Sequence, residues 1–149
     1  MILWRVTNHP TLDGNGGLRA SGRWHTRGRR IVYCAPNPAS ALLEVLVHAE
    51  IDEEDMPVAF RYLEIEVADS VSVEAADVGS LGTGWQRKQE LTRQLGDQWL
   101  RSRRAAFLRV PSVIVPASWN FLLNPLHPDS AKVRILRIDK QPVDPRLLR

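Results

Sequence analysis

The spacing of apolar and polar residues along the chain predicts several strands and two main helices. Residues 2–6 alternate between two faces, with Trp4 on one face and Arg5 on the other, as in a strand. Further strand-like runs are expected at 31–33, 58–67, 71–73, 107–110, 112–115 and 133–139. Helical spacing is present over 38–48 and 86–102, where Gly96 is expected to weaken the helix by about 1 kcal/mol relative to alanine. Strands and helices in no regular βαβ alternation predict an α+β fold, a single compact domain of short twisted sheets with a few helices.

The first helix carries a carboxylate inside an otherwise apolar segment. Asn37 is suited to the N-cap and Pro38 to the first helical position. An apolar stripe that requires a core follows, made of Leu42, Val45, Leu46 and Ala49. Glu44 lies beside this stripe, with small residues one turn before it. Two interpretations stay open: a carboxylate at the rim of a site, or one solvated on the outer face.

The segments between these elements are read as loops. Residues 11–22 are rich in glycine but lack the Gly-Lys-Ser/Thr ending of a phosphate-binding P-loop. Residues 51–56 read as an acidic linker, 79–85 as a loop, and 120–125 as a run that ends in a turn before His127. The tail after residue 139 is proline-rich and polar.

Composition narrows the class of protein. The 149 residues are expected to form one domain over 1–149, and the single cysteine, Cys34, excludes an internal disulfide and fits a reducing compartment. We find no signal peptide and no run long enough to cross a bilayer, so a cytoplasmic location is expected. The net charge of +3 is modest, but five arginines lie between positions 19 and 30. They suit phosphate or carboxylate groups, or else form a solvated basic surface or a contact face for an acidic partner.

The remaining polar groups suggest one kind of site. The four histidines have no ligand spacing, so no metal site is expected, and no Gly-x-Ser-x-Gly motif supports a serine hydrolase. Six polar residues lie within apolar runs: Arg5, Arg23, Tyr33, Glu44, Ser112 and Asn120. Each can be explained as structure. Together they suit a phosphorylated, ring-bearing ligand held around one carboxylate, and the plane of Trp24 beside Arg23 is suited to stacking a ring.

Several short blocks of sequence follow one another in a recognisable order: Trp4-Arg5-Val6, Gly22-Arg23-Trp24-His25, Val32-Tyr33, Ala41 to His48, Thr92-Arg93, Gly96-Asp97-x-Trp99-Leu100, Pro111 to Pro116, and Asn120 to Pro128. In this order the blocks resemble the RES domain family, whose members are toxins of RES–Xre toxin–antitoxin pairs. They span nearly the whole chain. The arginine, glutamate and serine of the family's name correspond to Arg5, Glu44 and Ser112. Two further positions match Arg23 and Tyr33, while the position after Trp24 is often asparagine in the family and is His25 here.

The resemblance implies a fold like that of diphtheria-toxin-type ADP-ribosyltransferases and an enzyme that consumes NAD as substrate, without a separate cofactor. Glu44, Arg5 and Ser112 would be catalytic, and Arg23, Tyr33, Trp24 and Asn120 would bind NAD. An Xre-type antitoxin is the implied partner, nucleic acid would be contacted only through it, and no membrane is involved. A homodimer is also compatible with the family, because Trp85 and Trp119 suit a partner surface as well as a core.

Several functions remain open at this point. The first is cleavage of the nicotinamide–ribose bond by an NAD glycohydrolase or phosphorylase, and the second is ADP-ribosylation of a protein target. The acceptor, whether water, phosphate or a protein side chain, is not specified by the resemblance. A different class of function is a non-catalytic, arginine-rich module that binds protein or nucleic acid. A ribonuclease is a further option, although no histidine pair supports it.

Overall fold

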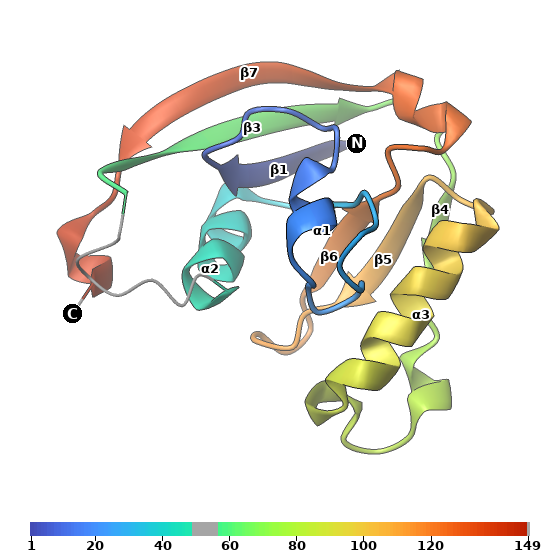
Figure 1. Ribbon diagram of the computed structural model, residues 1–149. Coiled ribbons are helices and arrows are strands. Elements are labelled where there is room, and N and C mark those ends of the chain that lie inside the picture. The colour runs from blue at the N-terminus through green and yellow to red at the C-terminus, as the bar shows by residue number, and fades with distance from the viewer. Residues whose placement is uncertain (49–56, 149) are drawn as a thin grey trace.

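Two β-sheets form the framework of the computed structural model, which describes residues 1–48 and 57–148. The first sheet has the order β1 (Ile2–Thr7), β3 (Ala59–Val67) and β7 (Val133–Pro142), with antiparallel neighbours. It forms the arched layer at the top of Figure 1. The second sheet has the order β2 (Val32–Cys34), β6 (Trp119–Leu123), β5 (Phe107–Pro111) and β4 (Val73–Ala75), and only its β4–β5 pair is parallel. The predicted α+β class is confirmed.

The alternation within β1 places its residues in two different environments. Leu3 lies in the main core with residues of both sheets, including Val32 and Phe107. Val6 instead packs against Ala41 of the first long helix, with Trp4 beside it. Arg5 shares the Leu3 face and donates from Nη1 to the Tyr33 carbonyl of β2 at 3.2 Å. The first sheet therefore presents a guanidinium toward the second.

Three α-helices accompany the sheets in the described residues: α1 (Asn15–Arg19), α2 (Pro38–His48) and α3 (Gln89–Ser102). The Asn37 side-chain oxygen accepts the Ser40 N–H at 2.8 Å, which confirms Asn37 as the N-cap of α2. In Figure 1, α2 lies below β1 and α3 flanks the second sheet. Short 3-10 turns are present at Val78–Leu81, Trp85–Arg87, Pro128–Lys132 and Pro145–Leu148.

Gly96 is required in α3, rather than merely tolerated there. A Cβ atom at this position would lie 1.7 Å from the Trp24 carbonyl oxygen, because the helix and the loop before β2 touch backbone to backbone. Trp99 and Leu100 of the same helix are buried with Trp24 in a second core cluster. The expectation that this glycine simply weakens the helix misses the contact that it permits.

Other expectations about local structure need correction. Residues 112–115 form a turn rather than a strand, because the Ser112 hydroxyl accepts backbone N–H groups at 114 and 115. The glycine-rich segment 11–22 contains helix α1, and 79–85 contains parts of two 3-10 turns. Residues 119–123 pair as β6, and the last strand extends to Pro142. The acidic segment 51–56 and Ala49 lie outside the described residues.

Candidate active site

A cavity of about 540 Å³ lies beside helices α1 and α2 and is bordered by the loop that follows α1. Its walls come from β1, β2, α2 and the segment 20–23, and include Arg5, Arg23, Tyr33, Glu44 and Asn120. Five of the seven predicted site residues therefore line one cavity. They come from segments that are distant in the sequence, so the fold brings them together.

The Glu44 carboxylate projects from α2 and is held by side chains of two other segments. Asn120 of β6 donates from Nδ2 to its Oε1 at 2.8 Å, and Ser112 donates from Oγ to the same oxygen at 3.1 Å. Hydrogen bonds to a charged oxygen are stronger than those between neutral groups. These two donors fix the orientation of Glu44 at the cavity wall.

Ser112 acts through this contact rather than by facing the cavity. Its hydroxyl oxygen accepts the N–H groups of Ile114 and Val115 at 3.1 and 3.2 Å, while its proton is directed to Glu44. Its own N–H donates to the Ser118 carbonyl at 2.9 Å. The turn that follows β5 therefore locks the hydroxyl in place, and the geometry suits a residue that positions Glu44.

Two arginines direct incompletely bonded guanidinium groups at the cavity. The Nε atoms of Arg5 and Arg23 are both buried, and neither has a hydrogen-bond partner among the described residues. Burial lowers the pKa of both guanidinium groups from the ordinary value, and the nearby Arg93 lowers the pKa of Arg23 further. A buried donor without a partner is costly, so this arrangement favours an anionic ligand between the two groups.

Tyr33 of β2 lines the same cavity, and its hydroxyl is hydrogen-bonded within the protein. The hydroxyl oxygen accepts the Trp24 N–H at 3.2 Å and lies 2.7 Å from His25 Nδ1. Burial raises the pKa of Tyr33 well above its usual value, so the phenol stays protonated. The half-buried ring is thus held by its tip while it lines the cavity.

Trp24 differs from the other predicted site residues. Its side chain is buried, packs against Trp85 with ring centroids 5.9 Å apart, and belongs to the core cluster of α3. It reaches only a small second hollow of about 20 Å³. Its role in substrate binding stays a prediction, and its surroundings favour a structural one.

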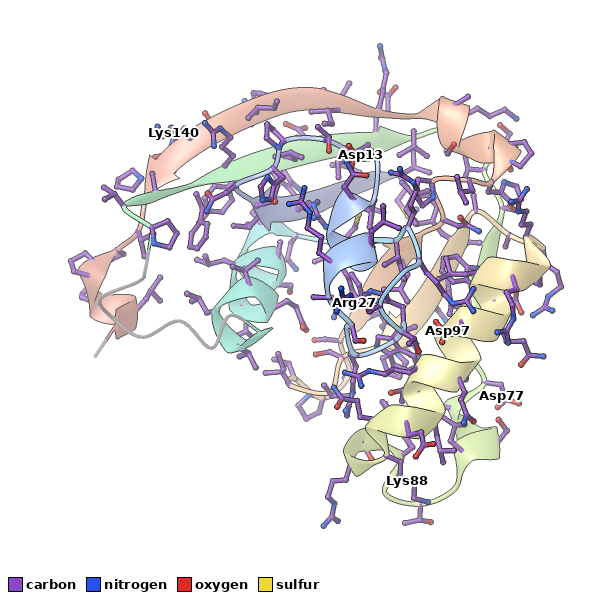
Figure 2. All side chains as sticks on the ribbon, in the orientation of Figure 1. Asp13, Arg27, Asp77, Lys88, Asp97 and Lys140 are labelled. Carbon is purple, nitrogen blue, oxygen red and sulfur yellow. The ribbon has the colours of Figure 1, made fainter. Side chains whose placement is uncertain are left out.

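Three residues of α3 hold the Arg23 loop, and sequence reasoning assigns no role to them. Thr92 donates from Oγ1 to the Arg23 carbonyl at 2.7 Å, and Arg93 donates from Nε to the Gly22 carbonyl at 2.8 Å. Asp97 accepts from the Thr26 N–H at 2.9 Å and from its hydroxyl at 2.6 Å. Figure 2 shows Asp97 on the side of α3 next to this loop. The motif blocks Thr92-Arg93 and Gly96-Asp97 carried the signal, but only the fold shows what they bind.

Apart from Arg23, which lines the cavity, the arginines between positions 19 and 30 divide into two groups. Arg29 pairs with Asp97 at 3.3 Å, and Arg30 donates to the Asp13 carbonyl at 3.1 Å and to the Asn15 side chain. These two therefore support the loop, while Arg19 and Arg27 are exposed. The single cysteine, Cys34, is buried in the main core, and burial raises the pKa of its thiol to about 12.

The described residues were also considered as possible membrane spans and metal sites. Within 1–48 and 57–148, no helix has the length and apolar character needed to cross a membrane. The same ranges hold no group of three or more His, Cys, Asp and Glu side chains placed to bind a metal ion. Trp119 is 40% exposed under the guanidinium of Arg109, and Trp85 packs against Trp24, so the homodimer stays a prediction.

Comparison with solved structures supports the fold. The chain is similar to a chain of the M. tuberculosis MbcT–MbcA toxin–antitoxin complex, with a TM-score of 0.75 at 16% identity. The match covers 99% of this chain and 86% of that one. At this identity the likeness concerns the arrangement of the backbone.

Sequence comparison identifies relatives over most of the chain. A protein named Toxin Res from Pseudomonas putida is 50% identical over 137 residues, which cover 91% of this chain and 93% of the relative. A protein from Sphingobium sp. named Prs ADP-ribosylating toxin is 40% identical over 142 residues, covering 93% and 87%. Another Toxin Res, from Photorhabdus laumondii, is 33% identical, with 89% and 86% covered. The RES domain family model matches residues 2–145, and the chain therefore belongs to the RES domain family.

Proposed function

We propose that this protein is a toxin that cleaves the nicotinamide–ribose bond of NAD and so depletes the cell of the dinucleotide. One observation carries the proposal: a carboxylate fixed by two donors faces the same cavity as two guanidinium groups with buried, unpartnered Nε atoms. An NAD molecule combines an anionic diphosphate with two ribose groups and a nicotinamide ring. The cavity supplies groups suited to each of these parts.

The chemistry assigns a separate task to each side chain. Loss of nicotinamide leaves positive charge on the ribose carbon and its ring oxygen, as in glycoside hydrolysis, and the Glu44 carboxylate stabilises that charge or binds a ribose hydroxyl. The Tyr33 ring stacks on nicotinamide and orients it. Arg5 and Arg23 bind the diphosphate, which satisfies their free donors. Ser112 and Asn120 keep the reactive carboxylate in one orientation.

The acceptor distinguishes the variants of this reaction. Transfer of the ADP-ribosyl group to water or phosphate corresponds to a glycohydrolase or phosphorylase, and transfer to a protein corresponds to an ADP-ribosyltransferase. The second variant is favoured by a specific observation, the name of the Sphingobium relative at 40% identity. Both variants begin with the same bond cleavage and need the same carboxylate.

The biological setting follows from the same relatives. Two of the three named relatives are called Toxin Res, and the similar solved structure is a toxin–antitoxin complex. We propose an antitoxin of the Xre type as the partner, which blocks the cavity and supplies any contact with nucleic acid. A cytoplasmic location fits a protein whose substrate is NAD, and no cofactor or metal is included in the proposal.

Incubation of the purified chain with NAD tests the proposal directly. The wild type should release nicotinamide, whereas Glu44→Gln, which retains an oxygen to accept from Asn120, should lose at least a hundredfold in rate. Glu64→Gln is the matched control, because Glu64 pairs with Arg137 on the first sheet and lies outside the cavity lining. Labelled NAD with a cell extract distinguishes a protein acceptor from water and phosphate. Intact NAD alongside shortened RNA, or undiminished release by Glu44→Gln, contradicts the proposal.

A further inference from the structure

The hydrogen bonds around His25 determine which of its ring nitrogens carries the proton. The ring is buried, its Nε2 lies 2.9 Å from the Ala20 carbonyl oxygen, and its Nδ1 lies 2.7 Å from the Tyr33 hydroxyl. A carbonyl oxygen can only accept, so Nε2 is the donor and Nδ1 of the neutral ring is the acceptor. The Tyr33 hydroxyl therefore donates to His25 and accepts from the Trp24 N–H.

The cavity wall is folded tightly around this pair of rings. A Cβ atom on Gly22 would lie 2.4 Å from the Tyr33 hydroxyl oxygen and 2.9 Å from His25 Nδ1. The Gly22 N–H in turn donates to the His25 carbonyl at 3.1 Å. Because Ala20 and Gly22 line the cavity next to Arg23, the bonds of one imidazole connect the aromatic ring of the site to the loop beside it.

The titratable groups around His25 come from two elements besides its own loop, α3 and β2. Asp97 of α3 favours the protonated ring, as do the carbonyl at Ala20 and a backbone contact with Gly17, whereas Arg93 of α3 opposes it. Tyr33 of β2 is protonated and neutral. Burial outweighs the favourable contacts and lowers the pKa of His25 below its ordinary value.

We propose that His25 is a positioning residue, whose neutral imidazole holds the Tyr33 ring and the 20–23 wall in the geometry that binds NAD. A proton on Nδ1 turns this acceptor into a donor. The Tyr33 hydroxyl then faces two donors, and its own hydrogen loses its acceptor in a buried site. Protonation of His25 thereby releases the ring and makes the activity fall in acid. The kinetic part of this inference depends on the proposed NAD cleavage, and the structural part does not.

Two variants separate positioning from simple packing. His25→Asn replaces the imidazole with an amide, whose oxygen can accept a hydrogen bond and which cannot titrate. His25→Ala removes the contact altogether. His9→Asn is the control, because His9 is exposed and lies outside the cavity lining.

Nicotinamide release should be measured between about pH 5 and 8. For the wild type and His9→Asn, kcat/KM should fall about tenfold for each pH unit below the pKa of His25. His25→Asn should lose this acidic limb while it keeps most of the activity at neutral pH. His25→Ala should be about tenfold or more lower throughout. An acidic limb in His25→Asn that is unchanged from the wild type overturns the proposal.

A second measurement is independent of catalysis. Nitrogen-detected NMR of the imidazoles should show His25 with a proton on Nε2 alone at neutral pH, and the Tyr33 ring signals should shift when His25 titrates. A proton on Nδ1 at neutral pH, or Tyr33 signals indifferent to the titration, refutes the structural part even if NAD is not the substrate. If the NMR result holds and no variant releases nicotinamide, the proposed function fails and the His25 contact stands.

Discussion

Replacement of Gly96 by alanine should destabilise the protein, although helix propensity alone predicts the opposite. In an exposed helix, glycine to alanine gains about 1 kcal/mol. Here the new Cβ atom would lie 1.7 Å from the Trp24 carbonyl oxygen, whereas real Cβ contacts essentially never fall below 3.0 Å. The loop backbone must therefore move away from α3 by more than an ångström.

The movement removes contacts as well as creating strain. Overpacking of this kind costs about 1–3 kcal/mol, and each lost hydrogen bond to the loop costs about 1 kcal/mol more. The bonds at risk are those from Thr92 to the Arg23 carbonyl at 2.7 Å and from Thr26 to Asp97 at 2.6 and 2.9 Å. If two of these three bonds are lost and the gain in propensity of about 1 kcal/mol is subtracted, the net loss is about 2–4 kcal/mol.

Urea denaturation measures this loss as a midpoint lowered by about 1 M or more. Gly16→Ala is the matched control, because Gly16 is also helical but its Cβ would have no neighbouring atom within 4 Å. Nicotinamide release should fall in Gly96→Ala, because the displaced loop carries Arg23 away from the cavity. A Gly96→Ala protein as stable as the wild type, or more stable, would refute the close contact between α3 and the loop.

Three further predictions concern other parts of the site and core. The Cys34 thiol, with its pKa raised to about 12 by burial, should resist a thiol reagent in the native state and react at once in urea; rapid native labelling would contradict this burial. The free energy of unfolding should fall as the pH drops below about 6.5, because the unfolded chain regains the ordinary histidine pKa at His25 and binds a proton there. The stabilising contribution of the neutral His25 ring is therefore complete above that pH and is lost in acid. In urea titrations, His25→Asn should show a shallower dependence of stability on pH. Ser112→Ala should cost about 1 kcal/mol of stability and lower kcat more than it raises KM, because the Glu44 carboxylate loses the hydrogen bond from the Ser112 hydroxyl that helps to orient it; an unchanged kcat would remove the assigned positioning role.

The sequence alone predicted the strands and helices whose periodicity is strong. The strands at 2–6 and 58–67 and the helix capped by Asn37 are recognisable because a single pattern decides each of them, and the structure has them as Ile2–Thr7, Ala59–Val67 and Pro38–His48. The predicted strand at 112–115 is wrong, because a run of four apolar or small residues is compatible with a turn as well as with a strand. The hydrogen bonds that the Ser112 hydroxyl oxygen accepts from the N–H groups of residues 114 and 115 decide between them, and these bonds are visible only in three dimensions.

The sequence predicts which residues belong to the candidate site, but it does not predict the contacts between them. Polar residues such as Arg5 and Glu44 stand out within apolar runs, and the family resemblance selected them. Their hydrogen-bond partners do not stand out, because the bonds to Glu44 join residues 68 and 76 positions apart and those to Asp97 span 71. No local pattern encodes such separations. The sequence selects Trp24 because an aromatic plane beside Arg23 suits the stacking of a ring, whereas in the structure Arg23 lines the cavity and the Trp24 ring packs in the core.

Two separate sets of contacts therefore shape the site: one orients the Glu44 carboxylate, and the other holds the Arg23 loop. The two sets share no residue. The carboxylate of α2 is oriented by Ser112 and Asn120 from the second sheet and its turn, so those contacts act on the reacting group. The Arg23 loop is held by the buried side of α3 and by the rings of His25 and Tyr33, so those contacts act on binding. Changes in the first set should alter kcat, and changes in the second should alter KM and stability together. A double-mutant cycle between the two sets should consequently be additive in kcat/KM, and strong coupling would show that the cavity behaves as one unit.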